Sequence, residues 1–141
     1  MTSSTARQVL IDTSVYIENL KFGRFERELL TLPFLVRCSA VVLAELWRGA
    51  RSRQAKRFVA ALARQCRVIV PNEGAWLESG QIVAKLADRH GYDVHKLREI
   101  HFDVLIALTA RQIGAVVITC NARDFQAIRA VKAFELVCWL V

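Results

Sequence analysis

The chain has 141 residues, of which 54% are hydrophobic and 23% charged, and its formal net charge is +7. This length suits one domain with a core large enough to be stable. No run of about eighteen apolar residues is present and Asp12 breaks the first apolar run, so neither a membrane span nor a signal peptide is expected. The expected location is therefore the cytoplasm, and the basic charge suggests a polyanionic partner, either nucleic acid or an acidic protein segment.

Short apolar segments alternate with helical ones along the chain. Strands are predicted, in chain order, at QVLIDT, FLVRCS, RVIVP, AVVIT and AFELVCWLV. Helices are predicted at residues 14–20, 23–32, 40–50, 52–65, 73–90 and 102–114, with a turn and a short helix at 121–128. Ser39 is expected to cap the third helix and Gly114 to end the helix at 102–114, whereas residues 91–101 are expected to form a polar connector.

The strands are continuously apolar and helices lie between them. This pattern is typical of the α/β class, with a central, mostly parallel sheet flanked by helices on both faces. We expect one domain over residues 1–141, with residues 1–7 as a flexible N-terminal extension.

Two acids follow predicted strands. Asp12 ends the first strand, and Asp124 lies five residues after Thr119, the last residue of AVVIT. In open parallel sheets the ligand site lies at the carboxyl ends of the strands, so both acids are expected at the same rim. Each also has a simpler interpretation: Asp12 could cap the next helix, and Asp124 could be an ordinary turn residue.

Two further acids lie on predicted helices. Glu45 shares the helix face of Val41 and Val42, one turn before it, where a carboxylate is costly unless it is paired or bound to a cation. Asp103 opens FDVLIALTA, whose following turns present the small Ala107 on the same face. The alternative for Asp103 is a favourable interaction of a first-turn acid with the helix dipole.

Four acids at one rim suit divalent metal binding. Mg²⁺ and Mn²⁺ take oxygen ligands and can activate water and neutralise a phosphodiester. Basic residues that could contact phosphates follow Glu45 within about three helical turns. They are Arg48, Arg51, Arg53, Lys56 and Arg57, and solvated helix faces are their alternative interpretation.

With these residues in place, the chain resembles the PIN-domain ribonucleases, and specifically the VapC-type toxins of bacterial type II toxin–antitoxin pairs. The resemblance runs over nearly the whole chain. It rests on three blocks in order, LIDTSVYIENL with Asp12, SAVVLAELWRGA with Glu45, and FDVLIALTARQIGAVVITCNARDF with Asp103 and the T-x-N-x-x-D-F pattern that ends in Asp124 and Phe125.

The resemblance implies an endoribonuclease that depends on Mg²⁺ or Mn²⁺. By this similarity Asp12 and Asp103 are the main metal ligands, and Glu45 and Asp124 complete the acidic pocket. Residues implied to hold the pocket by hydrogen bonds are Thr13, Ser14, Thr119 and Asn121. It further implies a homodimer, a cognate VapB-type antitoxin that blocks the site, and binding of operator DNA only through that antitoxin.

Other functions remain open at the sequence level. A phosphoacceptor signalling domain would need an acid pair after the first strand, where this chain has Thr13 and Ser14 behind Asp12. A non-catalytic nucleic-acid-binding module would need only the basic charge, which leaves Glu45 unexplained. A metal-dependent DNA nuclease of related fold has the same requirements as a ribonuclease, because metal chemistry at a phosphodiester does not distinguish the sugar.

Overall fold

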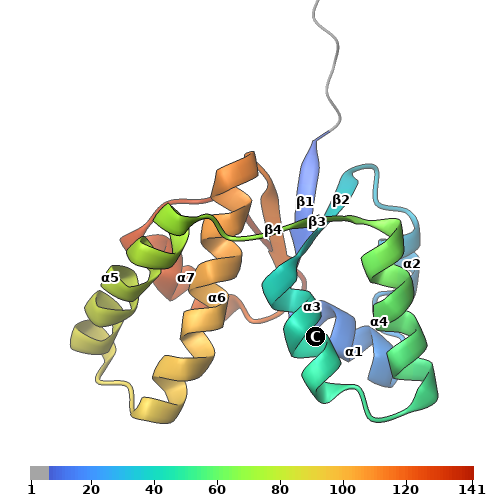
Figure 1. The fold of residues 1–141 in the computed structure, drawn as a ribbon, viewed down its shortest axis with the longest axis horizontal. Helices are drawn as coiled ribbons and strands as arrows, with labels where there is room; N and C mark the ends of the chain where they lie inside the picture. Colours follow the sequence, from blue (N-terminus) through green and yellow to red (C-terminus); the bar gives the residue numbers. More distant parts are fainter. Residues whose placement is uncertain (1–6) are drawn as a thin grey trace, which may run out of the picture.

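The computed structural model describes residues 7–141 as a five-stranded sheet with seven helices (Figure 1). The strands are β1 (Gln8–Ile11), β2 (Leu35–Ser39), β3 (Arg67–Ile69), β4 (Val116–Thr119) and β5 (Leu136–Cys138). Their order in the sheet is β3-β2-β1-β4-β5 and every pairing is parallel, which confirms the predicted class. Apart from Arg7, the expected flexible extension lies outside the described residues.

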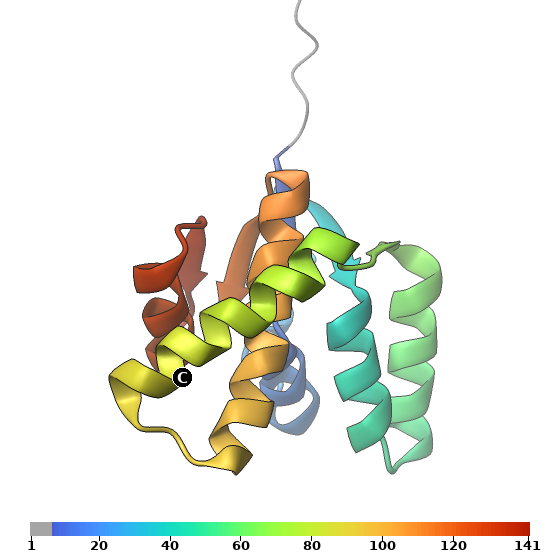
Figure 2. The ribbon, with the colours of Figure 1, turned by 60° about the vertical axis from the view of Figure 1, so that its left-hand side comes forward.

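The helices lie on both sides of the sheet. Their bounds are α1 (Thr13–Phe22), α2 (Glu26–Leu30), α3 (Ala40–Gly49), α4 (Arg53–Gln65), α5 (Glu73–His90), α6 (Val94–Ile113) and α7 (Ala122–Val131). Helices α5, α6 and α7 form one group and α1 to α4 the other (Figure 1). Within these groups α4 lies antiparallel to α3, and α5 crosses over α6 (Figure 2).

Local sequence signals set the helix ends. The hydroxyl of Ser39 accepts a hydrogen bond from the backbone N–H of Val41 at 3.1 Å, so Ser39 caps α3 as predicted. Gly114 ends α6 with a φ of 66°, a left-handed conformation that favours glycine. These two signals fix where α3 leaves the sheet and where α6 returns to it.

The core is built from the strands and one helix. Val9 to Ile11 of β1 and all of β4 are buried, as expected for strands covered on both faces. Residues 104–110 of α6 are buried without a break, so α6 is the central helix of its group. Within residues 7–141 we find no helix with both the length and the apolar character needed to cross a bilayer.

The segment at residues 91–101 differs from its prediction as a polar connector. Only residues 91–93 connect α5 to α6, and α6 begins at Val94. The Asp93 carboxylate caps this helix by accepting a hydrogen bond from the backbone N–H of Lys96 at 2.8 Å, and Ile100 is fully buried. Asp103 is therefore the tenth residue of α6, and the interpretation as a first-turn acid on the helix dipole is wrong.

Candidate active site

The candidate site lies beside β1, where the direction of sheet growth reverses. The chain adds β2 and β3 on one side of β1 and β4 and β5 on the other, so the crevice at the carboxyl ends of β1 and β4 is the topological switch point. Asp12 follows β1 there, and its backbone N–H donates to the carbonyl of Ile118 at 2.8 Å. The sheet itself therefore positions Asp12 in the crevice.

Asp12 is held by hydroxyl groups. Its Oδ2 atom accepts hydrogen bonds from Ser14 Oγ at 2.6 Å and from Thr119 Oγ1 at 2.8 Å. The same oxygen accepts from the backbone N–H of Ser14 at 3.4 Å, so Asp12 also caps α1. Burial raises the pKa of Asp12 above its ordinary value, although the hydrogen bonds from Ser14 and Thr119 oppose the shift.

Glu45 lies on the inner side of α3, one turn after the buried Val41 and Val42. Its Oε1 accepts a hydrogen bond from Thr13 Oγ1 at 2.8 Å, which links the first turn of α1 to α3. Burial raises the pKa of Glu45, the bond from Thr13 lowers it, and the negative charge of Asp12 raises it further. The predicted inward orientation of this carboxylate is therefore observed.

Asp103 lies among the other three acids. Burial raises the pKa of Asp103 to about 9, and the negative charges of Asp12, Glu45 and Asp124 add to the shift. The positive charge of Lys96 opposes it. A carboxyl group in these surroundings holds its proton at neutral pH unless a cation is added.

Asp124 lies in the first turn of α7 and is buried, so it is more than an exposed turn residue. Its Oδ2 accepts hydrogen bonds from Asn121 Nδ2 at 3.0 Å and from Lys96 Nζ at 2.5 Å. The Asn121 backbone N–H donates to Thr119 Oγ1 at 2.9 Å, which joins this group to the hydroxyls around Asp12. The structure thus connects Thr119, Asn121 and Asp124 in one network.

The four carboxylates suit a hard divalent cation by their chemistry. In the part of the chain described here, the hydrogen bonds to Asp12 and to Asp124 all go to Oδ2, so the Oδ1 atoms of both are left for a cation. Burial and, beyond it, repulsion from the neighbouring acids raise the pKa of Asp103, and a cation would relieve the repulsion. As the side chains lie, no group of three or more acidic, His or Cys residues within residues 7–141 is close enough to hold a metal ion.

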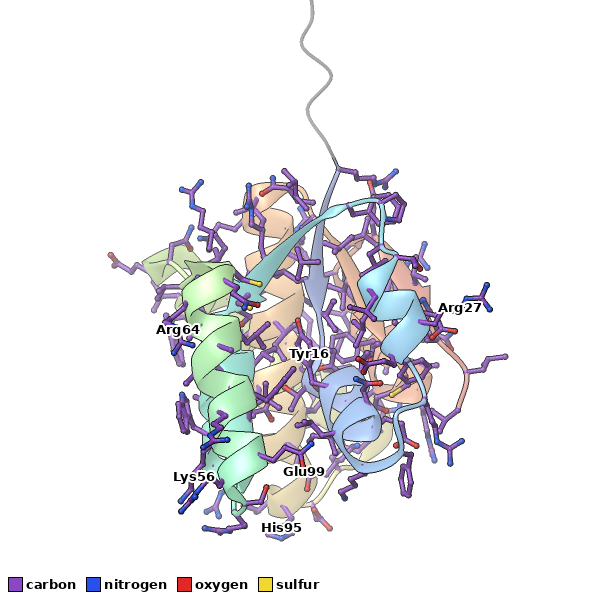
Figure 3. All side chains as sticks on the ribbon, turned by 90° about the vertical axis from the view of Figure 1, so that its right-hand side faces the viewer. Tyr16, Arg27, Lys56, Arg64, His95 and Glu99 are labelled. Carbon is purple, nitrogen blue, oxygen red and sulfur yellow. The ribbon has the colours of Figure 1, made fainter. Side chains whose placement is uncertain are left out.

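The predicted basic residues lie outside the acidic cluster. All five are exposed: Arg48, Arg51, Arg53, Lys56 and Arg57. Arg48 lies closest, with its guanidinium 4.0 Å from Glu45 and 5.5 Å from the centre of the Phe102 ring. Figure 3 shows Lys56 at the same end of the molecule as His95 and Glu99 of α6, whereas Arg64 lies further along α4.

Residues of α6 within the segment predicted as a connector complete the surroundings of the acidic cluster. They contribute Lys96 to the acidic cluster and His95, Arg98 and Glu99 to a pocket of about 240 Å³ beside Glu45, Arg48 and Phe102. Lys96 is a site residue that the sequence pattern did not predict. Asp93 followed by an apolar residue at position 94 is a helix-start signal that could have placed it on a helix.

Fold and site together define an α/β protein with an acidic cluster at the switch point of a parallel sheet. The profile of the PIN domain family matches residues 9–131, and the chain belongs to this family. Comparison with curated protein sequences gives no match.

Solved structures of high similarity are toxin–antitoxin complexes. The DNA-bound VapBC from Salmonella typhimurium matches with 26% identity and a TM-score of 0.71, covering 94% of this chain and 98% of the other. VapBC-1 from nontypeable Haemophilus influenzae matches with 25% identity, a TM-score of 0.67 and the same coverage. VapBC-5 from Mycobacterium tuberculosis, at 20% identity and a TM-score of 0.61, shows the fold alone. The resemblance to PIN-domain proteins of the VapC type is thereby confirmed.

Proposed function

We propose that this chain is a metal-dependent endoribonuclease and the toxin of a toxin–antitoxin pair. The observation that carries the proposal is the meeting of four carboxylates from four different elements: Asp12, Glu45, Asp103 and Asp124. Mutual repulsion of this kind is unfavourable for a merely structural cluster and favourable for a site that receives a cation. The PIN domain match and the likeness to VapBC complexes support the same function.

Asp12 and Asp103 would be the main ligands of a Mg²⁺ or Mn²⁺ ion, with Glu45 and Asp124 completing the pocket. The bound ion would supply charge neutralisation at the scissile phosphodiester and a more acidic water. Hydrogen bonds from Ser14, Thr119, Thr13 and Asn121 hold the carboxylates in fixed orientations. Such positioning lowers the reorganisation needed when substrate phosphate arrives.

The basic residues are proposed to position the RNA backbone. Arg48 lies next to the acidic cluster, and Arg51 to Arg57 continue away from it along the α3–α4 turn and α4. Contacts of this kind hold a strand without reading its sequence. The net charge of +7 attracts a polyanion to an enzyme whose reactive centre is itself acidic.

The partner is proposed to be a VapB-type antitoxin. A groove of about 430 Å³ between α1, α3 and α4 is lined by apolar Ile17, Leu46 and Val59 and reaches Glu45 at one edge. A protein segment bound there would lie directly beside the acidic pocket and could block it. We further propose that the chain forms a homodimer in the cytoplasm and meets operator DNA only through its antitoxin, as the family resemblance implies.

The decisive experiment is cleavage of total cellular RNA by the purified protein with Mn²⁺, with Mg²⁺ and with chelator. Discrete fragments are expected with either metal and none with chelator. Asp12→Asn removes one carboxylate charge with little change in shape and is expected to lower cleavage by at least ~100-fold, as removal of one catalytic group commonly does. The matched control is Asp88→Asn, because Asp88 is exposed on α5 outside the site, and this variant is expected to cleave like wild type.

Single-stranded DNA in the same assay distinguishes the competing functions. Metal-dependent cutting of DNA in preference to RNA would replace the ribonuclease by a DNA nuclease of the same fold. RNA binding without cleavage of any nucleic acid, by folded protein in the presence of metal, would favour a non-catalytic binding module.

A further inference from the structure

Lys96 places an ammonium group against the Asp124 carboxylate, at the α7 side of the acidic cluster. Its Nζ atom lies 2.5 Å from Asp124 Oδ2, and the Asp124 side chain is only 10% exposed. The same positive charge acts on Asp103, where it opposes the effect of the neighbouring carboxylates. Lys96 therefore interacts with two of the four acids of the proposed metal site.

The position of Lys96 is fixed by several contacts. Its backbone N–H donates to the capping Asp93 carboxylate at 2.8 Å, and its Nζ lies 5.8 Å from the centre of the Tyr92 ring. Its side chain is 31% exposed, whereas the Arg48 side chain beside Glu45 is 68% exposed and reaches that carboxylate only at 4.0 Å. Exposed pairs of that length contribute little, so of these two cations Lys96 interacts more strongly with the acids.

The charges of the cluster limit how many ions it can take. Four ionised carboxylates carry four negative charges, which two divalent cations would balance in full. With Lys96 in place the net charge of the acids and the lysine is −3, and one divalent ion reduces it to −1, so a second would leave an excess of positive charge. Nζ and the amide of Asn121 both bind Oδ2 of Asp124, so this carboxylate has only Oδ1 left for an ion and cannot bridge two of them through both oxygens.

We propose that the Lys96 ammonium takes the place of a second metal ion, so that the chain binds one divalent cation and uses a tethered lysine as the other positive charge of the site. This inference rests on the proposed function, because it assumes that the acidic cluster binds metal. Lys96 acts as a positioning residue: it holds Asp124 and keeps positive charge at the α7 side of the pocket when the single ion is bound.

The test is the number of Mn²⁺ ions bound per chain, measured by calorimetry and by electron paramagnetic resonance of free Mn²⁺. Wild type is expected to bind one ion. Lys96→Met keeps an unbranched, flexible side chain that ends one atom short of Nζ, removes the charge and is expected to bind two. Lys96→Gln, which keeps a hydrogen-bond donor for Asp124, is made in parallel so that the test does not depend on the folding of one variant, and circular dichroism checks both.

Lys132→Met is the matched control. Lys132 pairs with Glu78 at 2.8 Å and is 34% exposed, close to the values for Lys96, but the pair joins α7 to α5 outside the cluster. This variant is expected to bind one ion. Two ions in wild type, or one ion in both wild type and the Lys96 variants, would overturn the proposal while leaving the nuclease function intact. No ion in any of these proteins would overturn both the proposal and the metal site on which the proposed function depends.

Discussion

At the scale of single residues, each acid of the cluster that has a hydrogen-bond partner is held by a short polar side chain. Ser14 and Thr119 hold Asp12, Thr13 holds Glu45, and Asn121 holds Asp124. All four partners, Thr13, Ser14, Thr119 and Asn121, are ones that the family resemblance implies, and their hydrogen bonds to the acids are present in the structure. The arrangement fixes carboxylates that repel one another, so the site stores an electrostatic cost that a cation would relieve.

Asp103 allows this cost to be measured through the pH dependence of stability. Its pKa is raised from 3.8 to about 9, so between these values the folded protein keeps a proton that the unfolded chain has released. The unfolded state then binds fewer protons, and the free energy of unfolding falls as pH rises through this window. Asp103→Asn removes this contribution and is expected to stabilise the metal-free protein at pH 8 by about 1 kcal/mol or more, with no gain near pH 4.

Urea unfolding in chelator at several pH values, followed by circular dichroism, measures the effect. Asp88→Asn, at an exposed position, is expected to follow the wild-type pH profile. Because Asp12 and Glu45 remain in the variant with raised pKa values, the slope should decrease without vanishing. A profile for Asp103→Asn that parallels wild type over the whole range would show that Asp103 is not an electrostatic member of the cluster.

At the scale of elements, apolar runs and capping residues in the sequence predicted the strands and the helix ends. Each predicted strand is observed, and the continuous apolar runs of β1 and β4 correspond to burial on both faces, whereas the edge strands β3 and β5 are partly exposed. Ser39 begins α3 and Gly114 ends α6, as predicted. The first eight residues of α6 were missed because their polarity masks a single buried position, Ile100. The Asp93 cap is the local signal that starts the helix there, and packing of α6 as a whole against α5 and α7 supports it.

In the candidate site too, some residues could be placed from the sequence and others could not. Asp12 and Asp124 could be placed from the sequence, since each follows a strand that ends at the switch point. The contact between Lys96 of α6 and Asp124 of α7 joins residues that are 28 positions apart in the chain, and no periodicity within either helix indicates it. Phe102, predicted as the first residue of a helix, lies in the interior of α6 with its ring against Arg48.

The start of α6 gives a prediction at this scale. Asp93→Ala removes the carboxylate that accepts the Lys96 N–H, and the free energy of unfolding is expected to fall by about 1 kcal/mol. Asp93→Asn keeps a capping oxygen and is expected to stay close to wild type. Urea unfolding of the three proteins checks this. Equal losses in both variants would mean that the negative charge matters and the cap does not, and no loss in either would mean that packing alone fixes the start of α6.

At the scale of the whole molecule, a net charge of +7 surrounds a cluster of four acids. The acids repel a phosphate backbone, so binding must come from cations placed beyond them. The residues proposed for this role occupy the end of α3, the following turn and the first turns of α4, at the end of the molecule where His95 and Glu99 also lie (Figure 3).

Reversal of Arg51 and Arg57 to Glu tests whether this region contacts RNA. Each lost phosphate contact on a single strand reduces the slope of log K against log salt by about 0.7, so the double variant should lose about 1.4 of it as well as affinity. Arg64 and Arg67 are also exposed but lie towards the far end of α4 and on β3, and their double reversal changes the net charge equally. Anisotropy of a labelled single-stranded RNA in chelator, over a range of KCl concentrations, measures both slopes. If the two variants lose equal slope, the net charge attracts RNA without a defined path, whereas a loss confined to Arg51 and Arg57 places the strand along the α3–α4 turn towards Glu45.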